Sequence, residues 1–150
     1  MPEQKNRRPP QVVLAFDFGT RRIGVACGDT MSRTASALAA VPAADGGPRW
    51  DLIDALMREW QPALAVVGLP YNVDGSESTT AAAARGFGAA LGRRYRVPVE
   101  YIDERYSSLE GGARLREARA AGLRKRRVAK SDLDAAAACV ILERWISAVT

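Results

Sequence analysis

The stretch Val12–Asp29, with the sequence VVLAFDFGTRRIGVACGD, constrains the fold more than any other part of the chain. It opens with an apolar run rich in β-branched and large residues, which is typical of a buried strand. The chain then turns at residues 19–21. In the segment that follows, three residues alternate with smaller ones as in a second strand: Ile23, Val25 and Cys27. The stretch therefore predicts a β-hairpin.

Asp17 interrupts the apolar run close to the turn, with Arg21 and Arg22 beside it. A carboxylate at the end of a buried strand is costly unless a hydrogen-bond donor, a cation or a metal pairs with it. The alternative is an aspartate that only hydrogen-bonds its own turn. Asp17 is thus a candidate functional residue with a structural explanation still open.

Length and composition set bounds on the class of protein. The 150 residues predict one domain, residues 11–150, after a disordered basic tail at residues 1–10. The net charge of +5 favours a polyanionic partner. No apolar run is long enough to cross a membrane and the tail has no secretory signal, so we expect a cytoplasmic protein.

The chain contains no histidine, which excludes histidine-dependent triads and HExxH zinc sites. Its two cysteines lie in apolar surroundings and do not suggest a disulfide framework or a zinc site. Any chemistry must therefore use carboxylates, lysine, hydroxyls or a metal ion.

Beyond the hairpin, apolar runs alternate with helical patterns. We expect strands at 33–41, 63–68 and 97–102, a loop at 42–48, and helices at 51–60, after Ser76, after Ser107 or Ser108, and at about 132–148. The expected buried residues of the first two helices are Leu52, Ile53, Leu56, Met57 and Trp60, then Ala84, Phe87, Gly88 and Leu91. A helix between apolar runs predicts a βαβ crossover and parallel strands, hence an α/β fold.

Three acids stand where the apolar elements would not tolerate them without a reason: Asp17, Asp103 or Glu104, and Asp134. If they converge on one edge of the sheet, oxygen ligands without histidine select Mg²⁺ or Mn²⁺. Two such ions can activate water and stabilise the leaving oxygen of a phosphodiester. Alternatively, Asp134 belongs to a capping box that begins at Ser131, and the acids at 103–104 pair locally with Arg105.

Basic residues are dense from Arg114 to Lys130, with eight against one acid. Such a run is either a solvated surface or a phosphate-binding surface, and its lack of balancing acids favours phosphate. The predicted nucleic-acid contacts are Arg21, Arg22, Arg105, Arg124, Lys125, Arg126, Arg127 and Lys130.

Four segments resemble the YqgF (RuvX) family: LAFDFGTRRIGVACGD, VVGLPYNVDGS, YIDERYSS and DAAAACVILERW. The resemblance covers nearly the whole chain after residue 10. It implies a ribonuclease H-like fold, with a mixed five-stranded sheet flanked by helices on both faces. The family names imply either processing of precursor 16S rRNA or resolution of Holliday junctions.

The resemblance also implies roles for particular residues. Asp17, Glu104 and Asp134 match the family's acids and would be both catalytic residues and metal ligands. Related junction resolvases carry an acid at the end of the fourth strand, where this chain has Gly68-Leu69-Pro70. Glu104 is the natural substitute for that ligand.

The leading hypothesis is an endonuclease that uses Mg²⁺ or Mn²⁺, with two ions, on branched DNA or precursor rRNA. A junction has two-fold symmetry and would favour a homodimer, whereas an RNA end would not. One alternative is a non-catalytic RNA- or ribosome-binding module. Another is a phosphotransferase, because residues 17–20 also resemble the phosphate hairpin of actin-like kinases, although the chain is too short for their two domains.

Overall fold

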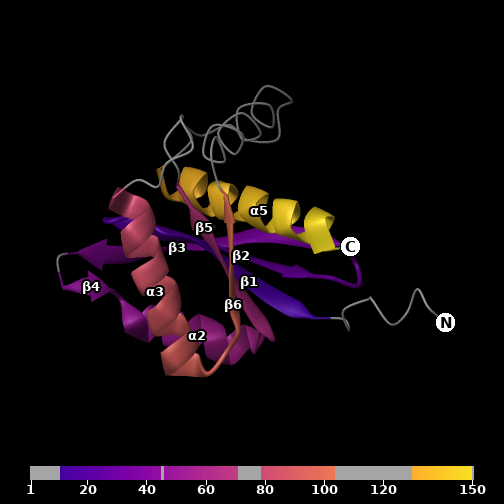
Figure 1. Cartoon of the computed structure of the whole chain (residues 1–150), viewed down its shortest axis with the longest axis horizontal. Coiled ribbons are helices and arrows are strands. Elements are labelled where there is room, and N and C mark those ends of the chain that lie inside the picture. The colour runs from indigo at the N-terminus through magenta and orange to yellow at the C-terminus, as the bar shows by residue number, and fades with distance from the viewer. Residues whose placement is uncertain (1–10, 45, 71–78, 104–129, 150) are drawn as a thin grey trace.

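The computed structural model describes residues 11–44, 46–70, 79–103 and 130–149. The elements in chain order are β1 (Val12–Asp17), β2 (Arg22–Asp29), β3 (Thr34–Ala44), β4 (Gly47–Pro48), α2 (Trp50–Trp60), β5 (Leu64–Leu69), α3 (Thr79–Tyr95), β6 (Val99–Asp103) and α5 (Lys130–Val149) (Figure 1). Of the helices described, none has the length and hydropathy that a membrane span requires.

One mixed sheet organises the fold, with the strand order β4-β3-β2-β1-β5-β6. The hairpin predicted from the sequence is present, because β1 and β2 pair antiparallel from Val12↔Asp29 to Asp17↔Gly24. β5 pairs in parallel with both β1 and β6. The predicted α/β fold with parallel pairing is therefore confirmed.

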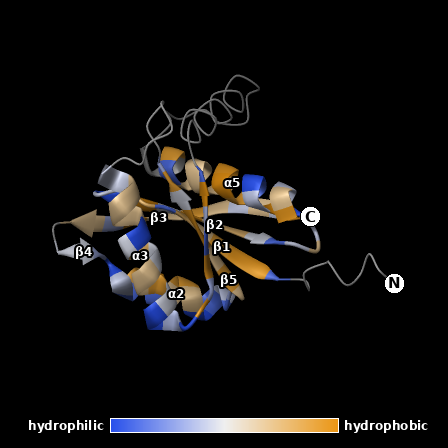
Figure 2. Cartoon of the chain, viewed as in Figure 1, coloured by the Kyte–Doolittle hydropathy of each residue, from blue (hydrophilic) through white to orange (hydrophobic). Residues whose placement is uncertain are grey.

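Helices cover both faces of the sheet (Figure 1). On one face α5 packs against Val13, Ala15 and Val66. On the other, α2 and α3 pack against a cluster that includes Leu14 and Phe16. Figure 2 shows hydrophobic residues concentrated in central strands such as β1, between the two helical layers. The sheet has two buried faces because it lies between helices, which explains why all six residues of β5 are buried.

The prediction of five strands, with a loop at 42–48, is wrong in this region. β3 continues to Ala44 and pairs with β4 through Ala43↔Pro48 and Ala44↔Gly47, which gives the sheet a sixth strand. Pro48 is tolerated here because β4 is the edge strand of the sheet, where a missing N–H interrupts no internal ladder. Gly47 has a φ of 104°, a conformation that glycine adopts without strain.

The predicted boundaries and apolar faces of the helices hold with small corrections. The apolar face of α3 is confirmed. In α2, Ile53 and Met57 are buried, and Leu56 and Trp60 pack partly buried against the same cluster. Leu52, which was expected to be buried, is 38% exposed. β6 begins at Val99, not at 97. The starts expected at Ser76 and at Ser107 or Ser108 lie outside the described residues.

Candidate active site

Asp17 ends β1 at the carboxyl edge of the parallel strands. The register aligns this edge, because Phe16 pairs with Val67 and Gly68 pairs with Ile102. Side chains alternate along a strand, so Asp17 shares its face with Val13 and Ala15, the residues that α5 covers. The half-buried carboxylate thus belongs to the α5 face of the sheet.

Gly24 brings the start of α5 to this edge. It is the cross-strand partner of Asp17 in the β1–β2 ladder. A Cβ atom at Gly24 would lie 1.9 Å from the backbone oxygen of Asp134 and 2.5 Å from its carbonyl carbon. Only glycine therefore allows the backbone of α5 to come this close to β2. Asp134 thus lies over β2, the strand that pairs with β1 beside Asp17.

The rest of α5 follows β2 in the same close packing. A Cβ atom at Gly28 would lie 2.8 Å from the Leu142 side chain. The interval from Asp134 to Leu142 spans roughly 12 Å along a helix, and that from Gly24 to Gly28 spans roughly 13 Å along a strand. The helix therefore runs along the strand. It also contacts β6, because the indole N–H of Trp145 donates a hydrogen bond to Glu100 Oε1 at 3.0 Å.

Arg22 forms an ion pair with Asp134. Its Nε donates to Asp134 Oδ2 at 2.7 Å, and the two side chains are 36% and 30% exposed. A residue predicted to contact nucleic acid thus contacts a predicted metal ligand. The pair holds the carboxylate of α5 against the start of β2, next to the strand that ends at Asp17.

The capping-box explanation of Asp134 is not supported by this geometry. α5 begins at Lys130, two residues earlier than expected, so Ser131 is its second residue and cannot be its N-cap. Asp134 lies in the second turn and is held by Arg22. Contacts with Arg22 and Gly24 of β2 therefore fix Asp134, and not a capping interaction within α5.

Asp103 lies on the opposite face of β6 from Glu100 and Ile102. Asp103 pairs with Leu69, and Tyr101 pairs with Val67, both on the face covered by α2 and α3. Ile102 packs with the α5 cluster. The strand therefore presents Asp103 away from the face that carries Asp17.

The other predicted site residues are only partly described. Arg21 lies exposed in the turn before β2. Lys130 opens α5, and its side chain is not described. Six predicted residues lie outside the described residues: Glu104, Arg105 and the block Arg124, Lys125, Arg126 and Arg127.

Two of the three predicted metal ligands can be tested against the structure. Among the described residues, no three acidic, cysteine or histidine side chains form a cluster that could hold a metal ion. Asp17 and the start of α5 nevertheless lie at the same edge, because Gly24 pairs with Asp17 and contacts the backbone of Asp134. Carboxylate oxygens are ligands that suit a hard divalent cation. Arg22 already pairs with the Asp134 carboxylate at this edge.

Sequence reasoning missed Gly24 and the partner of Arg22. A signal for the glycine was present, because from residue 24 every second residue of β2 is small: Gly24, Ala26 and Gly28. Small residues in phase along a strand indicate close approach of another backbone. The ion pair had no local signal, because its members lie 112 residues apart.

Comparisons with known proteins agree with this architecture. A protein from Marinobacter nauticus named "Putative pre-16S rRNA nuclease" is 47% identical over 145 residues, which are 97% of this chain and 96% of that protein. A protein of the same name from Xylella fastidiosa is 44% identical over 147 residues, covering 98% and 94%.

The solved structure of T. thermophilus RuvC in complex with Holliday junction substrate superposes with a TM-score of 0.54, covering 91% of this chain and 94% of RuvC. At 16% identity this likeness shows the fold alone, and it confirms the predicted ribonuclease H-like class. The family model described as RuvX: Holliday junction resolvase matches residues 11–148. The chain belongs to the RuvX family.

Proposed function

We propose that this chain is a divalent-metal-dependent endonuclease that acts on structured nucleic acid. The observation that carries the proposal is the contact between Gly24 and the backbone of Asp134, one strand away from Asp17. This contact brings the start of α5 to the edge at which β1 ends, so we infer that carboxylates from opposite ends of the chain share this edge. Open α/β sheets bind their ligands at this edge.

Glu104 is the third ligand that we propose. The described part of β6 supports it, because Glu100 and Ile102 face α5 and a side chain two positions further has the same phase. Asp103 has the opposite phase and shares its face with Val67 and Leu69. The strand phase therefore favours Glu104 over its neighbour, a choice that the sequence pattern leaves open.

Asp17, Glu104 and Asp134 would hold Mg²⁺ or Mn²⁺, and two such ions would activate water and stabilise the leaving oxygen of a phosphodiester. Arg22 would keep the Asp134 carboxylate oriented toward β2. Arg21 and the basic residues Arg105, Arg124, Lys125, Arg126, Arg127 and Lys130 would position the phosphates. The charge excess of the chain supports a polyanionic substrate.

The substrate that we propose is precursor 16S rRNA. The support is the name of the relatives at 44–47% identity, which align over nearly their whole length. A cytoplasmic location fits this substrate. Branched DNA is the second candidate, supported by the description of the family model, and it would favour a homodimer. The absence of an acid in β5, which ends in Gly68-Leu69, distinguishes this chain from resolvases with a ligand there.

The test compares cleavage of a precursor 16S rRNA fragment, a four-way DNA junction and a matched linear duplex in Mg²⁺, Mn²⁺ and chelator. We expect the rRNA fragment to be cut only with metal, and Asp17→Asn to bind it but not cut it. Undiminished cleavage in chelator would contradict the metal site. Junction cleavage without rRNA cleavage would assign the second substrate, and binding without any cleavage would identify a non-catalytic binding module.

A further inference from the structure

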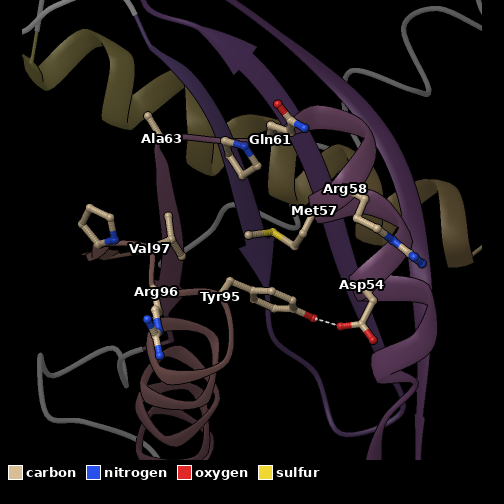
Figure 3. Close-up of a pocket in the computed structure, with 10 residues that line it drawn as sticks. Asp54, Met57, Arg58, Gln61, Ala63, Tyr95, Arg96 and Val97 are labelled. Atoms are coloured by element: carbon tan, nitrogen blue, oxygen red, sulfur yellow. Dashed lines mark hydrogen bonds between the residues drawn. The ribbon is translucent and has the colours of Figure 1, made fainter.

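A pocket of about 660 Å³ lies at the amino edge of the parallel strands, opposite the acids. It opens between the ends of α2 and α3 and the residues that lead into β5 and β6 (Figure 3). Its size is within the roughly 300–1,000 Å³ typical of small-molecule sites. The six residues of β5 separate it from the acidic edge by roughly 20 Å.

The pocket has an apolar interior with one fixed aromatic wall. Met57 and Val97 are 8% and 9% exposed and line it together with the Tyr95 ring. The Tyr95 hydroxyl donates to Asp54 Oδ1 at 2.6 Å, shown as the dashed line in Figure 3. Arg94 donates hydrogen bonds to both carboxylate oxygens of Asp54, from Nε to Oδ1 at 3.0 Å and from Nη2 to Oδ2 at 3.1 Å. The ring is therefore held in place before any ligand arrives.

The rim of the pocket is cationic. Arg58 and Arg96 lie on opposite sides of it in Figure 3, both exposed. Within the described residues neither guanidinium forms an ion pair. The carboxylate of Asp54 is bound by Arg94, and the charge of Arg58 makes a smaller contribution to lowering its pKa. The two helix carboxyl ends contribute roughly half a negative charge each, less than the two arginines supply. The rim thus has positive charge available for an anion.

The residues that follow α2 and α3 at this pocket adopt a backbone conformation that is unfavourable for residues other than glycine. Gln61 has a φ of 43° and Arg96 a φ of 53°, the left-handed conformation in which glycine is the usual residue. A glycine would end either helix with less strain. Instead, both positions carry long polar side chains, and both line the same pocket. Their identity is explained by the pocket better than by helix termination.

We propose that this pocket binds a nucleoside phosphate. The base would pack against the Tyr95 ring, Met57 and Val97, the Gln61 amide would meet its polar edge, and Arg58 and Arg96 would bind the phosphate. The same chemistry is presented by a free mononucleotide and by a nucleotide within a single strand. The proposal does not depend on the acids at the other edge.

The experiment measures binding by calorimetry to the full chain with four probes: AMP, adenosine, inorganic phosphate and a single-stranded A₆ RNA. The variants are Arg58→Ala and Arg96→Gly, separately and together, with Arg93→Ala as the matched control. Arg93 is an exposed arginine in the same last turn of α3 that does not line the pocket. We expect AMP to bind more tightly than adenosine or phosphate alone. Each pocket variant should weaken the affinity for AMP by about tenfold or more, and Arg93→Ala should leave it unchanged.

Thermal unfolding separates binding from a structural role of Arg96. Arg96→Gly should raise the melting temperature, because it relieves the left-handed strain, while it weakens binding. If the chain binds A₆ but not AMP, and the double variant loses this binding, the ligand is a nucleotide within single-stranded RNA. Failure of both to bind, unchanged affinity in the double variant, or phosphate binding as tight as AMP would each overturn the proposal.

Discussion

The two faces of the sheet are packed in different ways. On the α5 face, β2 presents Gly24, Ala26 and Gly28, and the helix approaches close enough that its backbone touches the strand. On the α2 and α3 face the contacts are made by large rings. Phe87 has its ring 5.6 Å from that of Phe16 in an edge-on arrangement and 5.7 Å from that of Trp50 in a stack.

The difference shows how the chain positions its acids. Where a helix contacts a glycine, contact between the two backbones fixes the distance from the helix to the sheet. The position of Asp134 relative to Asp17 can therefore change little. Side chains on the other face can change rotamers to absorb a change in volume. The face with the strict geometry is the one that carries the candidate active site, and the tolerant face carries the pocket.

The largest effect is expected at Gly24. Gly24→Ala introduces a Cβ into the space of the Asp134 backbone and should cost about 3 kcal/mol of unfolding free energy. Gly86→Ala is the control, because a Cβ there meets nothing within 4 Å, and in helix α3 it should stabilise by about 0.5–1 kcal/mol. Urea denaturation of both variants measures the contrast. Equal stability would mean that α5 is not fixed by contact with β2.

A smaller loss is expected on the aromatic face. Phe87→Leu keeps an apolar side chain of moderate volume where the rings of Phe16, Phe18 and Trp50 meet. Because these neighbours can repack, the cost should be about 1–2 kcal/mol in the same denaturation experiment. A loss larger than that of Gly24→Ala would reverse the comparison between the two faces.

The ion pair on the α5 face should contribute less again. A double-mutant cycle of Arg22→Gln and Asp134→Asn, measured without metal, should give a coupling of about 0.2–1 kcal/mol because both side chains are partly exposed. A coupling near zero would show that the pair does not hold Asp134 in solution.

The smallest effect is on the pocket face and depends on pH. Hydrogen bonds from Arg94 and Tyr95 lower the pKa of Asp54 from 3.8 to about 2. A pKa lowered by folding stabilises the protein above the unfolded value, and the contribution is lost as the pH falls through the folded value. The melting temperature of Asp54→Asn should therefore lie slightly below that of the wild type at pH 7, and the gap should close between about pH 4 and pH 2. A gap that is constant over this range would exclude the carboxylate as its source.

Local patterns in the sequence predicted much of the fold. Apolar runs gave β1, β2 and β5, and helical spacing identified the buried residues of α3. β4 was missed because two residues with a proline make no strand pattern. The exposure of Leu52 depends on the width of the stripe that the sheet covers, which helical spacing does not encode.

The candidate site was predictable in its residue types but not in its geometry. Asp17 and Asp134 were identified because acids in apolar elements need a reason to be there. The choice between Asp103 and Glu104 required knowledge of the face that α5 covers, a contact between segments far apart in the chain. The strand phase that supports our proposal of Glu104 follows only from the alignment of β6 with β5.

We propose that Asp17, Glu104 and Asp134 share a divalent cation and that Asp103 does not bind it. Titration of Mn²⁺ followed by electron paramagnetic resonance measures free ion directly and does not depend on cleavage. We expect Asp17→Asn, Asp134→Asn and Glu104→Gln each to weaken Mn²⁺ binding by at least about tenfold, and Asp103→Asn to bind as the wild type does. Wild-type affinity in Asp17→Asn would contradict this metal site, as would loss of binding in Asp103→Asn with Glu104→Gln unaffected.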